Sequence, residues 1–209
     1  MKLYDFPKAP SPRRVRIFAA EKGLALTTVE VNLRQGEQFS QSYRSINPQC
    51  VVPFLVLDDG TGIGEVVAIC RYLEEIAPSP PLLGTDPTSK ALVAMWDHRM
   101  EVEGFAAVAE VLRNSAPTFR GRALTGPLAS DQIPPLADRG RARVAAFFDM
   151  LDRRLAESSF VAGPSFSMAD ITALVSVDFA DRVKIPAPEG HIHLKRWHEN
   201  VSLRPSATA

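Results

Sequence analysis

The sequence predicts an α+β protein, in which a mixed four-stranded sheet with its helices is followed by an all-α domain. Three observations indicate this: strand, helix and strand patterns open the chain, a strand hairpin follows, and strand patterns then disappear. A proline-rich segment separates the two parts. We therefore expect a first domain over residues 1–78, a linker over 79–86 and an all-helical domain over 87–209, which are ordinary domain sizes.

The chain opens with a strand–helix–strand pattern. Lys2–Tyr4 predicts the first strand. Ser11 is a favourable N-cap and Pro12 suits a first helical position, so we expect a helix that begins there and ends at Gly23. The segment Thr27–Val31 is rich in β-branched residues and alternates in polarity, which is typical of a strand. Two strands joined by a helix form a parallel pair with a right-handed crossover.

A hairpin completes the predicted sheet. Pro53 cannot donate a ladder hydrogen bond, so it belongs at the start of the apolar strand Phe54–Leu57 or just before it. Asp58–Gly60 is a turn sequence, after which Thr61–Ile63 is expected to return beside the first hairpin strand. Apolar residues at helical spacing then predict a helix over Glu65–Ile76.

The remainder of the chain predicts helices only. Apolar residues at helical spacing predict one long helix, marked by Leu92–Leu112, and a short closing helix around His193–Val201. Two further helices are marked by Val144–Leu155 and Ile171–Val175. Ala116–Pro135 is rich in proline and glycine and is expected to be a loop. Ser167 and Asp170 form an S-x-x-D capping box at a helix start, so we assign Asp170 a role in folding and not in catalysis.

Composition excludes several classes of function. The 24 basic and 24 acidic residues give a formal net charge of zero, which offers no electrostatic case for nucleic acid or an anionic membrane as partner. No apolar run approaches the roughly 20 residues that a membrane span needs. The opening residues contain no signal-peptide pattern, and Cys50 and Cys70 form no C-x-x-C pair, so we expect a cytoplasmic protein without disulfides. His191, His193 and His198 lack acidic or cysteine partners at metal-ligand spacing, and we expect no metal site.

The order proline, strand, hairpin, strand, acid and helix over Asn47–Glu75 resembles the glutathione S-transferase family. That family carries a Val-Pro pair, then Glu-Ser at a helix start, then Ala-Ile-x-x-Tyr-Leu. Val52–Pro53, Glu65 and Ala68–Leu73 match this pattern. The chain departs from it at Val66, where Ser or Thr is usual, and Cys50 stands where Gly is common. The resemblance extends over nearly the whole chain and implies that the N-terminal domain is thioredoxin-like.

The resemblance also implies a binding site for glutathione. A cis bond between Val52 and Pro53 would leave the Val52 backbone to pair with the cysteinyl part of the ligand. Glu65 would pair with the ligand's ammonium group, and the Val66 N–H would bind its α-carboxylate at a helix N-terminus. Because valine has no hydroxyl to add a second bond, we expect glutathione to bind less tightly than in a typical relative.

Ser11 has two possible roles. As an N-cap, its hydroxyl would satisfy a backbone N–H of the helix. The resemblance implies instead that Ser11 is catalytic and donates to the glutathione sulfur. Such a donor is useful because a free thiol has a pKa near 8.5 and only the thiolate attacks.

The resemblance implies an enzyme that transfers glutathione to small hydrophobic electrophiles, which is a detoxification reaction. It also implies a homodimer, and no cofactor beyond glutathione as co-substrate. Two alternatives stay open. One is a non-catalytic or weakly active binding protein with the same fold, which Val66 favours. The other is a glutathione-dependent disulfide reductase or isomerase, although a reductase would use a cysteine where Ser11 stands.

Overall fold

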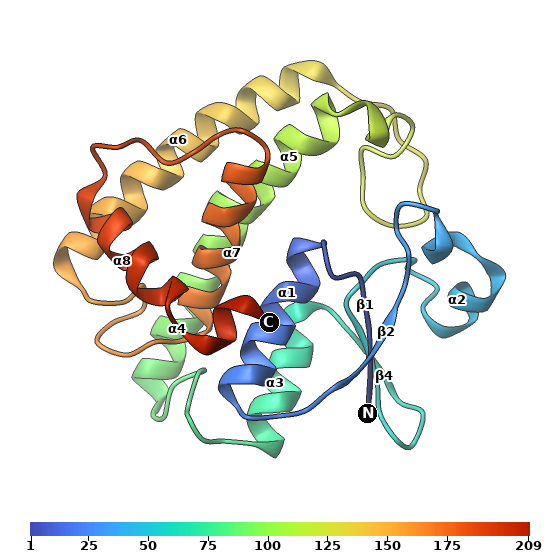
Figure 1. Ribbon diagram of the computed structural model, residues 1–209, viewed down its shortest axis with the longest axis horizontal. Coiled ribbons are helices and arrows are strands. Elements are labelled where there is room, and N and C mark those ends of the chain that lie inside the picture. Colours follow the sequence, from blue (N-terminus) through green and yellow to red (C-terminus); the bar gives the residue numbers. More distant parts are fainter. The chain divides into compact units, whose positions relative to one another are not determined.

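A computed structural model describes residues 1–209 and divides them into two compact units (Figure 1). The first unit contains Met1–Pro80, Leu124–Ala129 and the last residue. The second contains Pro81–Ala123 and Ser130–Thr208. The segment Leu124–Ala129 lies between helices of the second unit in sequence, yet it groups with the first unit, which the sequence did not indicate.

The first unit contains the predicted mixed four-stranded sheet. Its strands are β1 (Lys2–Asp5), β2 (Thr27–Glu30), β3 (Phe54–Val56) and β4 (Gly62–Gly64). Their order in the sheet is β2-β1-β3-β4. The β1–β2 pair is parallel, as the crossover requires, and the other two pairs are antiparallel. The prediction of the sheet is therefore confirmed.

Three helices accompany this sheet: α1 (Pro10–Glu21), α2 (Gln41–Ile46) and α3 (Val66–Ile76). The helices α1 and α3 pack against each other, and Figure 1 shows α2 on the other side of the strands. The core of the unit consists of fully buried apolar side chains from strands and helices, among them Leu3, Ile17, Phe18, Leu55 and Ile69. Apolar burial of this kind is the main force that holds the unit together.

The helix α1 begins earlier than the sequence predicted. Its N-cap is Ala9 and its first residue is Pro10, so Ser11 lies inside the first turn and caps nothing. The prediction of Ser11 as N-cap is wrong because two prolines compete for the first helical position, and Pro10 occupies it. The predicted end is confirmed. Gly23 has φ +65°, and its N–H donates to the Ala20 carbonyl in a Schellman-type ending.

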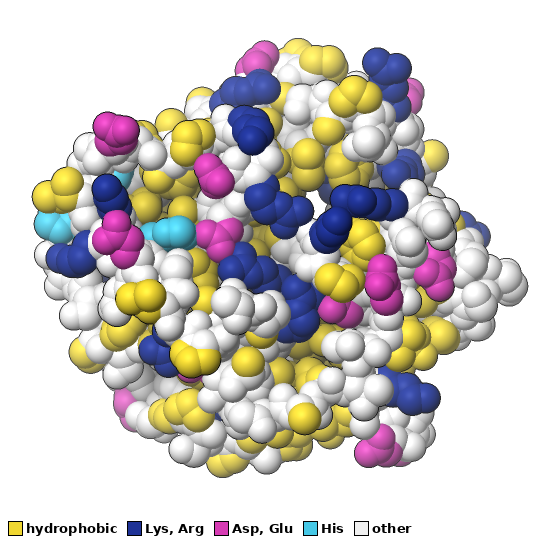
Figure 2. Space-filling model, in the orientation of Figure 1, with side chains coloured by type: hydrophobic (Ala, Val, Ile, Leu, Met, Phe, Trp, Pro, Cys, Tyr) yellow, Lys and Arg dark blue, Asp and Glu magenta, His cyan; other side chains and the backbone are white.

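The second unit is all-helical, as predicted. Its main elements are α4 (Pro87–Arg99), a π-helical segment (Met100–Phe105), α5 (Ala106–Ser115), α6 (Pro134–Glu157), α7 (Met168–Arg182) and α8 (Ile192–Ser202). Short 3₁₀ turns lie at Pro117–Phe119 and Pro205–Thr208. The helices of the chain include none that is both long enough and apolar enough to cross a bilayer. On the face that Figure 2 shows, acidic and basic side chains both occur among apolar ones.

The long helix predicted after the linker is interrupted by the π-helical segment. Gly104 lies in that segment, and a Cβ there would be 2.6 Å from the Phe147 ring of α6. Only glycine lets the Phe147 ring lie this close to the backbone of the segment. The spacing of apolar residues predicts one continuous helix, and this segment was not anticipated.

The start of α7 is the predicted capping box. Ser167 and Asp170 make both of its hydrogen bonds. Asp170 is fully buried and also accepts from the Val161 N–H at 2.9 Å and the Trp197 Nε1–H at 3.0 Å. Burial raises the pKa of Asp170 to about 6, against the lowering effect of these donors. The carboxylate therefore joins the loop before α7 and the helix α8 to the helix start.

Candidate functional site

The register of the sheet brings three of its strand ends together. Tyr4 at the end of β1 pairs with Phe54 at the start of β3. Phe54 in turn pairs with Gly64 at the end of β4. The end of β1, the start of β3 and the end of β4 therefore lie at one edge, and the segments attached to them start from the same place.

All the predicted site residues lie on these attached segments. The chain leaves β1 through a short loop into α1, which carries Ser11 in its first turn. Val52 and Pro53 enter β3, and Glu65 follows β4 directly. The structure thus places the three attached segments at a single end of the first unit.

The Val52–Pro53 bond is cis, which confirms that prediction. A second cis bond, Ser79–Pro80, lies in the predicted linker and was not anticipated. The Val52 residue is half-buried, and its N–H donates no hydrogen bond within the protein. This N–H is therefore a backbone donor that a ligand can use.

The N-terminus of α3 is shaped to receive an anion. Glu65 is its N-cap, with φ +62° and ψ 131°, a conformation that costs a non-glycine residue about 1–3 kcal/mol. No side chain caps the helix, so the N–H groups of its first turn have no side-chain acceptor. Those N–H groups and the positive end of the helix dipole favour a carboxylate.

The two side chains at this helix start differ in exposure. Glu65 is exposed, so its carboxylate is open to solvent. Val66 is only 5% exposed and belongs to the core of the protein. A hydroxyl at position 66 would therefore replace packed apolar surface on the side of α3 that also carries Ile69 and Leu73.

The hydroxyl of Ser11 is available for a ligand because it caps no helix. Its Oγ accepts a long hydrogen bond, 3.4 Å, from Nη2 of the buried Arg14. A hydroxyl that accepts from a guanidinium still has its own proton to donate. The geometry removes the capping role, and the donor role of Ser11 stays a prediction.

Sequence reasoning missed two residues beside this site. Tyr43 and Asn47 both donate hydrogen bonds to the carbonyl of Val51, the residue before Val52. Asn47 could have been found, since an Asn-Pro pair before a strand often forms a side-chain turn. Tyr43 could not, because only the fold brings it to this loop.

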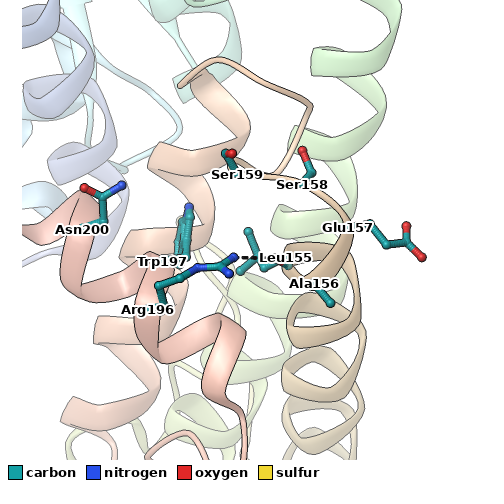
Figure 3. Close-up of a pocket in the computed structure, with 8 residues that line it drawn as sticks. All are labelled: Leu155, Ala156, Glu157, Ser158, Ser159, Arg196, Trp197 and Asn200. Carbon is teal, nitrogen blue, oxygen red and sulfur yellow. Dashed lines mark hydrogen bonds between the residues drawn. The ribbon is translucent and has the colours of Figure 1, made fainter.

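A separate hollow of about 370 Å³ lies in the second unit, between the end of α6 and the helix α8 (Figure 3). It is lined by Leu155–Ser159, Arg196, Trp197 and Asn200. The Arg196 guanidinium reaches across it to the Leu155 carbonyl, at 2.6 Å, and satisfies a carbonyl near the helix end. None of the predicted site residues lines this hollow, and we assign it no catalytic role.

No group of three or more His, Cys, Asp or Glu side chains is arranged to hold a metal ion. Of the histidines considered in the sequence, His191 and His198 each pair with one carboxylate, Asp149 at 2.8 Å and Asp178 at 2.6 Å. Such pairs are common structural contacts between helices.

Comparison with known proteins gives the family. A model of the glutathione S-transferase N-terminal domain matches residues 10–76, and one of the C-terminal domain matches residues 134–200. Glutathione S-transferase 2 of Saccharomyces cerevisiae is 35% identical over 99% of the chain and 87% of that protein. The chain belongs to the glutathione S-transferase family.

Two further relatives illustrate the range of this glutathione S-transferase family. Maleylacetoacetate isomerase of Rattus norvegicus is 29% identical, over 88% of the chain and 79% of that protein. A crystal structure of a glutathione S-transferase domain-containing protein of Marinobacter aquaeolei is 35% identical, with a TM-score of 0.91 and 99% coverage of both chains. The predicted thioredoxin-like domain followed by an all-helical domain is therefore confirmed as the glutathione S-transferase fold.

Proposed function

We propose that this glutathione S-transferase family member transfers the thiolate of glutathione to small hydrophobic electrophiles. The observation that carries the proposal is the sheet register, which starts the segments bearing Ser11, Val52 and Glu65 from one edge. Support also comes from the name of the yeast relative, a glutathione S-transferase that matches over almost the whole chain.

Each residue of the site has a defined role in the proposal. Glu65 pairs with the ammonium group of the γ-glutamyl end, and the Val66 N–H donates to the adjacent carboxylate at the uncapped start of α3. The Val52 backbone pairs with the cysteinyl unit. The Ser11 hydroxyl then donates to the sulfur and stabilises the thiolate, the form that attacks.

The reaction requires no further group on the protein. The thiol releases its proton to solvent water, the thiolate sulfur forms a bond to the electrophilic carbon, and the leaving group departs with the electron pair of its own bond. Binding both reactants side by side raises their effective concentration and so accelerates the bond-forming step. The proposal therefore needs no cofactor besides glutathione as co-substrate, and no metal.

A second candidate is glutathione-dependent isomerisation, because a maleylacetoacetate isomerase is among the relatives. Both activities begin with the same thiolate, so assays with an activated aryl halide and with maleylacetoacetate separate them. Reductase chemistry through the protein's own thiol has less support, since the Cys50 thiol is buried and donates to the Pro48 carbonyl. A binding protein without activity would bind glutathione and turn over neither substrate.

We further propose that the protein is a cytoplasmic homodimer that acts in detoxification. Large apolar side chains remain exposed in each unit, and they include Val67 and Ile76 of α3 and Leu92, Met95 and Val102 of the second unit. Surfaces of this kind are commonly covered by a protein partner. A sedimentation experiment on the purified chain tests the oligomeric state.

The Val66→Ser substitution tests the glutathione site directly. The added hydroxyl is expected to donate to the ligand carboxylate and to raise glutathione affinity about tenfold. A gain of about 1.4 kcal/mol in binding free energy corresponds to a tenfold lower Kd. Because Val66 is buried, the variant also loses part of the roughly 1.5–3 kcal/mol that a buried valine contributes to stability. Calorimetric titration with glutathione, below the unfolding temperature, measures the affinity.

Val66→Ala is the matched control, since it loses the same packing and gains no hydroxyl. If serine and alanine variants bind glutathione equally, the added hydroxyl makes no bond to the carboxylate, and the wild-type site already compensates for its absence. If neither the wild type nor Val66→Ser binds glutathione detectably, the proposed function is wrong.

Ser11→Ala tests the mechanism. Without the hydroxyl donor, the pKa of the bound thiol rises, so the pH profile of turnover is expected to move up by about one unit. Ser45→Ala, which removes an exposed hydroxyl of the same unit, is expected to leave the profile in place. A Ser11→Ala profile that stays at the wild-type position would assign thiolate stabilisation to another donor.

A further inference from the structure

The Val51 carbonyl is held by two side chains. The Tyr43 hydroxyl donates to it at 2.6 Å, and the Asn47 amide Nδ2 donates at 2.9 Å. Both residues are buried, with 4% and 2% of their surface exposed. Two short hydrogen bonds from buried donors restrict the direction of this carbonyl strongly.

The two donors are themselves fixed. The Tyr43 ring lies 5.8 Å from the ring of Tyr4, the β1 residue at the site edge of the sheet. Burial raises the pKa of Tyr43 to about 12, so the hydroxyl keeps its proton and remains a donor throughout the physiological pH range. The Tyr43 N–H is capped by Ser40 Oγ at 3.2 Å, which anchors the start of α2.

Asn47 connects the end of α2 to the loop. Its N–H donates to the Tyr43 carbonyl at 2.8 Å, and its Oδ1 accepts from the Gln49 N–H at 3.0 Å. Its carbonyl accepts from the N–H of Cys50, which has φ +55°. The hydrogen bonds of this one residue therefore fold the loop into a tight turn just before Val51.

The consequence follows from the planarity of the peptide bond. The bond between Val51 and Val52 is trans, so the Val51 C=O and the Val52 N–H lie in one plane and point in opposite directions. A carbonyl held toward Tyr43 and Asn47 forces the Val52 N–H to point away from them. That N–H makes no hydrogen bond within the protein.

We propose that Tyr43 and Asn47 are positioning residues that aim the Val52 N–H at the carbonyl acceptor of a bound cysteinyl peptide. The proposal rests on the proposed function for the identity of the ligand. Neither residue touches the ligand or the reacting sulfur. They act through the Val51–Val52 peptide plane, and so they affect binding and leave the thiol pKa unchanged.

Tyr43→Phe tests the proposal, because it removes the hydroxyl and keeps the ring against Tyr4. The glutathione Kd and KM are expected to rise about fivefold, the effect of one misaligned hydrogen bond, while the pH profile of turnover stays in place. The Val51 carbonyl ¹³C resonance is expected to move in the ligand-free protein. Asn47→Ala is expected to act in the same direction. Tyr72→Phe, which removes the same hydroxyl from a tyrosine of α3, is expected to leave both the glutathione affinity and the Val51 resonance unchanged.

Each contrary outcome identifies what fails. An unchanged Val51 resonance in Tyr43→Phe overturns the hydrogen bond itself. A moved resonance with unchanged glutathione affinity overturns the positioning role, while the proposed function survives. Equal losses of affinity in Tyr43→Phe and Tyr72→Phe also overturn it. If wild-type protein binds no glutathione, the proposed function fails and the positioning role fails with it.

Discussion

Replacing Asp170 with alanine is expected to lower the free energy of unfolding by at least about 3 kcal/mol at pH 7. The carboxylate accepts from the N–H groups of Val161 and Ser167 and from the Trp197 indole, and all three donors are buried with it. A buried donor left without an acceptor costs about 1–3 kcal/mol, and a whole domain is stable by only about 5–15 kcal/mol. Chemical denaturation followed by circular dichroism measures the loss.

Asp138→Ala is the control for this substitution. Asp138 also lies on a helix of the second unit and pairs with Arg141, but its side chain is 83% exposed. Its loss is expected to cost well under 1 kcal/mol, because exposed ion pairs contribute little. If Asp170→Ala kept full stability and lost turnover, Asp170 would be a catalytic acid and the assignment to folding would be wrong.

The cost of Asp170→Ala is also expected to depend on pH. The pKa of Asp170 is raised from 3.8 to about 6 by burial, so the folded protein binds this proton more tightly than the unfolded chain does. The stabilising contribution of that proton is complete below pH 3.8 and is lost as the pH rises through about 6. The difference in stability between wild type and variant should therefore shrink from pH 4 to pH 7.

Glu65→Ala is expected to lower glutathione affinity by about 10- to 100-fold. A charge-assisted hydrogen bond to the ligand's ammonium group is worth roughly 1.5–3 kcal/mol, which converts to that range. Because Glu65 is exposed, the substitution removes little packing and should leave the unfolding midpoint nearly unchanged. Calorimetric titration of both proteins with glutathione gives the ratio.

Glu75→Ala supplies the matched comparison, since it removes an equal charge from an exposed position near the other end of α3. It is expected to bind glutathione as the wild type does. Equal affinities for the Glu65 variant and the wild type would show that the ammonium group of the ligand is held elsewhere.

Much of the fold could be predicted because strong local signals agreed with it. Three features are each specified within a few neighbouring residues: the apolar hairpin strand Phe54–Leu57, Gly23 at a helix end, and the capping box of Ser167 and Asp170. The start of α1 was misplaced because Pro10 and Pro12 offer nearly equivalent local signals. The choice between them is made by packing, which the sequence pattern does not display.

The site could be predicted only in part for the same reason. Val52, Glu65 and Ser11 could be predicted as site residues because they belong to a pattern that is continuous in sequence or begins a helix. The role proposed for Tyr43 depends on how α2 packs against the loop that follows it, which no local pattern displays. The burial of Val66 does follow the helical spacing, because Val66 shares the apolar side of α3 with Ile69, Cys70 and Leu73.

The grouping of Leu124–Ala129 with the first unit limits how this chain can be divided or recombined. A Cβ at Gly126 would lie 3.4 Å from the Gln49 carbonyl, next to the loop that precedes Val52. A gene fragment that stops at the proline-rich linker therefore encodes an incomplete version of its own unit. A chimera that takes its C-terminal half from a relative also takes the relative's version of Leu124–Ala129. Its first unit then contains a segment from another protein.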